Sequence, residues 1–243
     1  MRLISYNLRN HSAVSDLESI VAIHDPDALC IQEAHTALLP RSIADLRLVQ
    51  ATAQNRLGLA MYLRPERFRT RDLRVVALRK SLHDRLMKPA HERLIAVRAF
   101  DAKYEQEVVL ASFHAAPLTA LNSLRRHQIT TAFSEMHDLG EGLPALMAGD
   151  YNYPFFQRSL ADRLRTQGYT LSKSDRSTYS RYRVLRGHYD FATSKGFEVE
   201  DVRTLPQSKS DHLPILVQAS LAPVAAKAEP VLVGPAAQPI PMV

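Results

Sequence analysis

Several short apolar runs in this chain end on polar residues that are capable of chemistry. Apolar runs of this length are typical of buried β-strands. When strands lie side by side, the groups at their ends gather at one rim, where a ligand or ion can enter. Carboxylate, amide and imidazole groups without a thiol cluster favour a hard metal ion and hydrolysis. The runs and their polar ends are 3–6 with Asn7, 28–32 with Glu33, 108–113 with His114 and 144–149 with Asp150, and His212 directly precedes a last run at 213–217.

The spacing of apolar residues predicts helices between these strands. Leu17, Ile20 and Val21 lie at i, i+3 and i+4 on one helical face, and Ser15 with Glu18 has the form of a capping box. A proline at 26 is expected to end this helix, because the residue before proline is pushed out of the α region. Strands outnumber helices, so we expect an α/β fold with two layers of sheet and helices outside. Further helices are predicted between 114 and 140 and over 155–167, and further strands at 58–63, 73–78, 94–100, 107–113, 144–148, 189–193 and 213–219.

Length and composition predict one domain over 1–220 and a tail over 221–243. The tail is rich in Ala, Pro and Val and holds five of the 14 prolines, so we expect it to be disordered. Cys30 is the single cysteine and lies in an apolar run, which predicts a core residue and excludes an internal disulfide. No secretory signal and no transmembrane run is visible, so a cytoplasmic protein is expected. The net charge of +6 fits either a phosphate-bearing partner or a simple solubility setting.

The residue types at the predicted rim suit the hydrolysis of a phosphate ester. Glu33 could anchor Mg²⁺ or Mn²⁺, which prefers oxygen ligands, and the amides of Asn7 and Asn152 could orient the ion or hold the phosphate. Asp150 suits the activation of water, and either histidine could hydrogen-bond the phosphoryl oxygens or protonate a leaving group. Taken singly, each of these residues also fits a turn, a cap or a surface position.

Six short motifs follow one another along the chain. They are Ser5-Tyr6-Asn7, Ile31-Gln32-Glu33, Phe113-His114, Gly149-Asp150-Tyr151-Asn152, Tyr189-Asp190-Phe191 and Ser210-Asp211-His212-Leu213-Pro214. Their order resembles the endonuclease/exonuclease/phosphatase superfamily, the DNase I-like group, and the resemblance covers 5–214. It implies a four-layer α/β sandwich, in which two packed, mostly antiparallel β-sheets are flanked by helices. It also implies a metal-dependent phosphodiester hydrolase.

The resemblance assigns metal and substrate roles to five of the motif residues. It implies that Glu33 binds Mg²⁺ or Mn²⁺ with help from Asn7, and that Asp211 lies near or on the metal. Asp150 and Asn152 would engage the attacking water and the scissile phosphate.

The resemblance also implies two pairs between histidines and carboxylates. Asp190 would pair with His212, and Glu92 would pair with His114. An imidazole that takes part in catalysis needs such a partner to fix its tautomer.

Basic residues outside the motifs are candidates for substrate contacts. One group, Arg79, Lys80, Arg85, Lys88 and Arg93, could form a phosphate-binding wall, or could be an ordinary solvated loop. A second stretch, over 176–186, mixes arginine with tyrosine, which suits stacking on bases and contact with phosphates. The predicted substrate-binding residues are Arg9, Tyr179 and Arg183.

These observations favour a nuclease that acts on DNA or RNA, although His35 departs from the DNase I pattern and weakens the case for cutting double-stranded DNA. The alternative keeps the same site and changes the substrate. The enzyme would then be a phosphatase or a phospholipase C-like hydrolase acting on a phosphoinositide, sphingomyelin or another small phosphate ester. A non-catalytic binding domain is the least favoured hypothesis, because every motif residue is present. No partner protein is implied.

Overall fold

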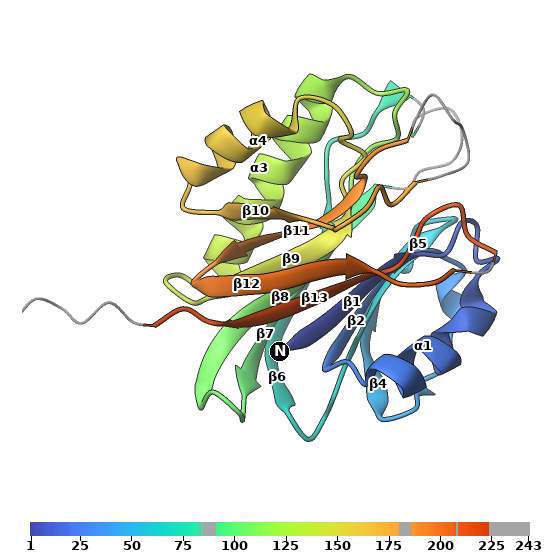
Figure 1. Cartoon of the computed structure of the whole chain (residues 1–243), viewed down its shortest axis with the longest axis vertical. Coiled ribbons are helices and arrows are strands. Elements are labelled where there is room, and N and C mark those ends of the chain that lie inside the picture. Colours follow the sequence, from blue (N-terminus) through green and yellow to red (C-terminus); the bar gives the residue numbers. More distant parts are fainter. Residues whose placement is uncertain (83, 85–90, 180–185, 208, 224–243) are drawn as a thin grey trace, which may run out of the picture.

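Two β-sheets form the centre of the computed structural model, which describes residues 1–223 apart from 83, 85–90, 180–185 and 208. Within these residues, one sheet has seven strands and the other has six (Figure 1). The predicted tail lies almost wholly outside the described residues. The seven strands are β1 (Arg2–Asn7), β2 (Ala28–Ala34), β3 (Ser42–Ile43), β4 (Leu46–Ala51), β5 (Gly58–Leu63), β12 (Phe197–Thr204) and β13 (Ile215–Leu221). The six strands are β6 (Phe68–Ala77), β7 (Glu92–Asp101), β8 (Gln106–His114), β9 (Ala145–Asp150), β10 (Thr170–Lys173) and β11 (Asp190–Lys195).

The strand order brings the ends of several strands together at one rim of each sheet. The sheets run β12-β13-β1-β2-β5-β4-β3 and β10-β11-β9-β8-β7-β6. The pairs β1–β2 and β8–β9 are parallel, so that Asn7 lies beside Gln32 and His114 beside Asp150. The start of the antiparallel strand β11 places Asp190 opposite Asp150. The rim predicted from the apolar runs is therefore present in each sheet.

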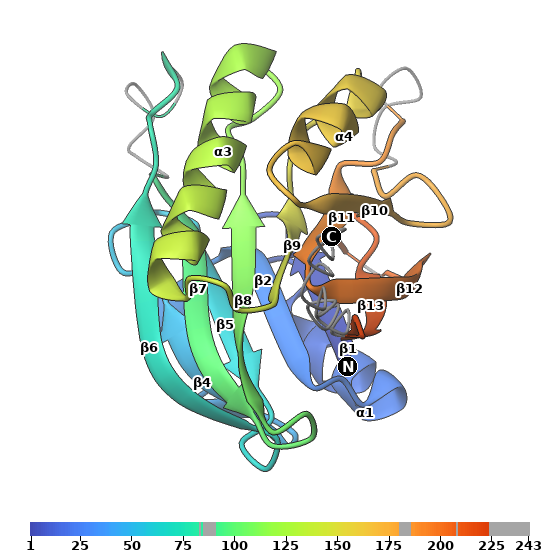
Figure 2. The same cartoon turned by 90° about the vertical axis from the view of Figure 1, so that its left-hand side faces the viewer.

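Helices cover the outer faces of both sheets and complete four layers. The helices α3 (Asn122–Leu139) and α4 (Gln157–Arg165) lie over the six-stranded sheet, and α1 (Leu17–His24) lies against the seven-stranded sheet (Figures 1 and 2). One buried cluster fills the space between the sheets, and two more lie under the helices. Cys30 is fully buried in the central cluster, as predicted. The four-layer α/β sandwich is confirmed.

The first helix is present, but its predicted cap is wrong. Ser15 lies inside a short 3-10 helix, η1 (Val14–Asp16), and Asp16 is the residue at the cap position, with no side-chain cap hydrogen bond. The end of the helix is as predicted. Asp25 takes a left-handed conformation with φ of 43° directly before the proline.

The apolar-run criterion missed the edge strands β3, β10 and β12, and also β4, which lies next to the edge strand β3. The strand β12 shows the reason, because it alternates between exposed charged residues and buried residues. A bulge between Val199 and Asp201 interrupts that alternation, so neither an apolar run nor a period of two is visible.

No helix in the described part of the chain is long and apolar enough to cross a membrane.

Gly149 tests the close packing directly beneath the rim. A Cβ at this position would overlap the backbone carbonyl of Phe113 on the neighbouring strand. We expect Gly149→Ala to lower the free energy of unfolding by about 3 kcal/mol or more, as measured by chemical denaturation. Gly142→Ala is the matched control, because φ there is 76° and no atom lies near the added Cβ. The control should lose about 1–2 kcal/mol from backbone conformation alone, and equal losses in both variants would contradict the packing argument.

Candidate active site

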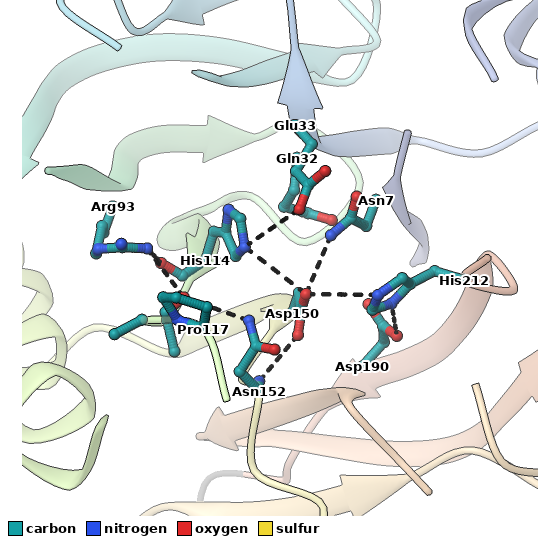
Figure 3. A network of polar contacts seen from close by, with 12 residues as sticks. Asn7, Gln32, Glu33, Arg93, His114, Pro117, Asp150, Asn152, Asp190 and His212 are labelled. Carbon is teal, nitrogen blue, oxygen red and sulfur yellow. Dashed lines mark hydrogen bonds and ion pairs between the residues drawn. The ribbon is translucent and has the colours of Figure 1, made fainter. Parts of the chain in front are cut away.

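The carboxylate of Asp150 lies at the centre of a polar cluster built from both sheets (Figure 3). Asn7, from the seven-stranded sheet, donates its Nδ2–H to Asp150 Oδ2 at 3.0 Å. The Nε2 atoms of His114 and His212 lie 3.7 and 3.8 Å from the same oxygen. The other oxygen accepts the backbone N–H of Asn152 at 2.9 Å. The structure thus brings together five residues that lie on four separate segments of the sequence.

The predicted pair between Asp190 and His212 is formed. Asp190 Oδ2 lies 2.8 Å from His212 Nδ1, and both side chains are buried. Burial alone would lower the pKa of His212, but the carboxylates of Asp190 and Asp150 outweigh burial and raise that pKa. His212 is therefore an imidazolium at neutral pH. Its free ring nitrogen faces the centre of the cluster, where it can donate a hydrogen bond.

The pKa of Asp150 is raised above its ordinary value, because the carboxylate is buried. Burial is the main cause, and the nearby carboxylates of Asp190 and Glu33 raise the pKa further. The positive charge of His212 and the N–H of Asn152 oppose this shift without cancelling it. A raised pKa suits a base that takes a proton from water near neutral pH.

His114 differs from His212 in its charge. Burial, with the charges of Arg93 and His212, lowers the pKa of His114 to about 3. The imidazole is therefore neutral at neutral pH. Its Nε2 lies 4.0 Å from Glu33 Oε1, so it stands between two carboxylates, one from each sheet.

The predicted pair between Glu92 and His114 is not formed between these two described residues. Glu92 Oε2 instead accepts the backbone N–H of Gln54 at 2.7 Å, and Asn55 donates to the Glu92 carbonyl. Glu92 therefore fixes the loop before β5. Nothing in the sequence indicated that Glu92 would contact Gln54, which lies 38 residues away in the chain.

Arg93 is buried rather than part of a phosphate-binding wall. Its guanidinium pairs with Asp84 at 2.6 Å and donates to the carbonyls of His114 and Ala115. Both side chains of the pair are 2% exposed. Arg93 therefore holds the segment that carries His114. Of the other residues in the predicted wall, Arg79 and Lys80 are exposed, whereas Arg85 and Lys88 lie outside the described residues.

Unusual backbone geometry directs two of the site side chains. Glu33 and Asn152 have φ of 54° and 49°, a left-handed conformation that costs energy for a residue with a side chain. At Glu33 the pairing of β2 with β5 is interrupted between Ile31 and Ala34, and this bulge turns the carboxylate towards the rim. Glu33 Oε2 accepts the N–H of Asn10 at 3.1 Å.

The remaining predicted residues lie around this cluster. Arg9 reaches Asp211 at 3.6 Å, and its backbone N–H donates to Asn7 Oδ1 at 2.9 Å. The ring of Tyr179 stands edge-on to that of His212, with the two centroids 5.0 Å apart. Arg183 lies outside the described residues.

Gln32 and two serines form a buried hydrogen-bonded group below the cluster, which was not predicted from the sequence. Gln32, in the seven-stranded sheet, donates its Nε2–H to Ser5 Oγ at 3.1 Å and to Ser112 Oγ, in the other sheet, at 3.2 Å. All three residues are fully buried. Buried polar groups that are hydrogen-bonded in this way fix a single arrangement of the sheets below the site. A glutamine inside an apolar run was the one available signal.

The donor set fits a divalent cation. In the described part of the chain, the carboxylates of Asp150 and Asp190 each bring a possible ligand oxygen to within 4.8 Å of the other, and Asp190 Oδ1 is buried without a hydrogen-bond partner. Glu33 adds a partly exposed carboxylate beside them. Carboxylate oxygens of this kind favour a hard cation.

The low pKa of His114 predicts a dependence of stability on pH. The unfolded chain takes up a proton at His114 below its ordinary pKa of 6.5, whereas the folded chain does not, so stability falls as the pH falls. From pH 7.5 to 5, we expect His114→Gln to lose about 2 kcal/mol less stability than the wild type, from 1.5 pH units at roughly 1.36 kcal/mol each. Denaturant unfolding in EDTA measures the difference.

The control for this prediction is His137→Gln, which changes a histidine that is exposed on α3. It should follow the wild type across the pH range. A curve for His114→Gln that also follows the wild type would show that His114 titrates normally in the folded protein.

Solved structures with the same fold include enzymes that act on different phosphate esters. The mannosyl-6-phosphatase of Bacteroides thetaiotaomicron has a TM-score of 0.73 at 17% identity, over 91% of this chain and 100% of that one. The human Nocturnin catalytic domain, with bound sulfate, has a TM-score of 0.74 at 14% identity, over 91% and 94%. D. rerio TDP2, in complex with a single-strand DNA product, has a TM-score of 0.70 at 15% identity, over 90% and 98%.

Sequence comparison gives the family. No curated protein matches the chain closely in sequence. The sequence model of the Endonuclease/Exonuclease/phosphatase family matches residues 4–212, which span all six motifs except the last two positions of the sixth. This chain therefore belongs to the Endonuclease/Exonuclease/phosphatase family, whose members are hydrolases of phosphate esters.

Proposed function

We propose that this protein is a divalent-metal-dependent phosphodiesterase that cleaves nucleic acid. The observation that carries the proposal is the buried Asp150 carboxylate with a raised pKa, which lies between the neutral His114 and the protonated His212. Such an arrangement supplies a base for water and a cationic hydrogen-bond donor for a phosphoryl oxygen at the same place.

Each residue of the cluster has a distinct task in this proposal. Asp150 accepts a proton from the attacking water, while Asn7 and the N–H of Asn152 hold its two oxygens in place. His212 donates its Nε2–H to the phosphoryl group or the leaving oxygen, and Asp190 keeps it protonated and oriented. The low pKa of His114 favours His212 over His114 as the proton donor.

Glu33 would hold the metal ion, with the amide of Asn7 and the carboxylate of Asp211 beside it. His212 is a poor metal ligand, because one ring nitrogen is bonded to Asp190 and the ring is cationic. A bound Mg²⁺ or Mn²⁺ neutralises charge on the phosphoryl group.

Several features favour nucleic acid as the substrate. The chain has a net charge of +6, Arg9 is 39% exposed at the edge of the cluster, and Tyr179 stands beside His212. Arginine and tyrosine at the mouth of a site suit contacts with backbone phosphates and bases. The structural similarity to TDP2, which was solved with single-strand DNA, agrees with this choice.

A phosphatase acting on a small phosphate ester is the second candidate. The similarity to a mannosyl-6-phosphatase, which is as close as that to TDP2, favours it. Both candidates use the same catalytic cluster and differ in what lies around it.

Asp150→Asn tests the catalytic assignment. We expect about a 10²–10⁴-fold loss of metal-dependent cleavage, because the amide cannot take a proton from water. Substrates are single-stranded and double-stranded DNA, RNA, a sugar phosphate, a phosphoinositide and sphingomyelin, each with Mg²⁺ or Mn²⁺. Asp201→Asn, on an exposed position of β12, should retain full activity. Full activity of Asp150→Asn would remove Asp150 from the mechanism, and release of inorganic phosphate alone would favour the second candidate.

Metal binding can be measured without any substrate. A ligand that binds only the folded state at 100 times its Kd adds about 2.7 kcal/mol of stability, which raises Tm by roughly 5–10 °C for a chain of this size. We expect Mg²⁺ or Mn²⁺ to raise Tm in the wild type and in the exposed control Glu18→Gln, and to have little effect on Glu33→Gln. An equal shift in Glu33→Gln would exclude Glu33 as the anchor.

A further inference from the structure

A pocket of about 680 Å³ opens between the start of α3 and the segment that follows β6. Its size is that of a site for a small organic ligand. The basic side chains of Arg79 and Lys80 line it, and none of the described residues that line it is a carboxylate. Leu82, Leu121 and Leu124 give it an apolar wall. The pocket therefore combines positive charge with apolar surface.

Hydrogen bonds tie this pocket to the catalytic cluster. The buried Gln128 of α3 donates to the carbonyl of Arg79 at 2.7 Å and accepts the N–H of Ala116 at 2.8 Å. The neighbouring residue, Ala115, donates its N–H to the carbonyl of Asp150 at 2.8 Å. The segment that carries Arg79 and the segment after His114 are thus held in one arrangement relative to Asp150.

The apolar wall is open to solvent. Leu82 is 72% exposed and Leu121 is 75% exposed, although large apolar side chains are normally covered. Polar groups that could bond the edge of a base stand among them, namely the hydroxyls of Thr119 and Ser123 and the ring of His127. Apolar side chains can pack on the face of a nucleobase, and cations can hold the adjoining phosphate.

We propose that this pocket binds a nucleotide that flanks the scissile phosphate in a single-stranded nucleic acid. The inference rests on the proposed function and makes it more specific. Arg79 and Lys80 hold the phosphate of that nucleotide, and the leucines contact its base. A polymer passing through the catalytic centre extends beyond the reacting group and reaches the pocket, whereas a small phosphate ester does not. A hollow with hydrogen-bonding groups also fits a base better than it fits a membrane surface.

The variant Arg79→Ala/Lys80→Ala tests the charge of the pocket. Gln128 bonds the backbone of Arg79, so the substitution leaves that support in place. The matched control is Arg69→Ala/Arg203→Ala, which removes two exposed arginines from β6 and β12. Binding of a fluorescein-labelled DNA oligonucleotide is followed in EDTA, where no cleavage occurs.

We expect the pocket variant to bind the oligonucleotide about tenfold more weakly than the control. The slope of log K against log salt should fall by about 0.7, because single strands lose roughly 0.7 for each neutralised phosphate and the two cations hold one phosphate. Leu121→Glu, at an exposed position, should weaken binding to a similar degree through repulsion. If both variants bind the oligonucleotide as tightly as the control does, the proposal that the pocket binds a nucleotide is wrong. It is also wrong if Leu121→Glu weakens binding to anionic phospholipid vesicles but not to the oligonucleotide.

A second readout separates this inference from the proposed function. With metal present, the pocket variant should lose about tenfold in kcat/KM for the oligonucleotide but retain the wild-type rate on bis(p-nitrophenyl) phosphate, which is too small to reach the pocket. An equal loss on both substrates would place Arg79 and Lys80 in the chemical step and overturn the inference. A wild type that cleaves neither substrate would overturn the proposed function, while the binding experiment still decides whether the pocket holds a nucleotide.

Discussion

The burial of one carboxylate, that of Asp150, sets the conditions for the rest of the site. A buried charge is costly unless it is paired or hydrogen-bonded, and Asp150 is supported by groups from both sheets. Asn7 comes from β1, whereas Asp150 ends β9, so their hydrogen bond crosses from one sheet to the other. The cluster can therefore form only when the two sheets are packed against each other as they are in this structure.

Neighbouring charged groups also explain why the two histidines differ in charge. Both are close to Asp150, and the side chains of His212 and His114 are only 8% and 15% exposed, but His212 has Asp190 at hydrogen-bond distance, and His114 has the guanidinium of Arg93 nearby. A carboxylate stabilises the imidazolium, and a cation opposes it. One imidazolium and one neutral ring thus arise from the same residue type, because their neighbours differ.

Strand ends could be predicted from the sequence because a buried strand is a run of consecutive apolar residues, and the run ends where the strand leaves the core. The apolar runs before Glu33 and His114 gave the central strands, and the order of the motifs gave the pairing of Asp190 with His212. Contacts between side chains that are distant in sequence have no such pattern. Glu92 bonds a loop on another strand, and Arg93 is buried because Asp84 neutralises it. Edge strands such as β12 were missed because solvent on one face, together with a bulge, removes the pattern.

The double hydrogen bond of Gln128 gives α3 a fixed angular setting. Because each residue turns an α-helix by about 100°, one residue inserted before Gln128 would point its amide away from both Ala116 and Arg79. Seven inserted residues would restore its direction, since they make about two full turns. The length of the first turns of this helix is therefore constrained by the segment after His114. A change of length before Gln128 must preserve the rotation of the helix if the amide is still to face both partners.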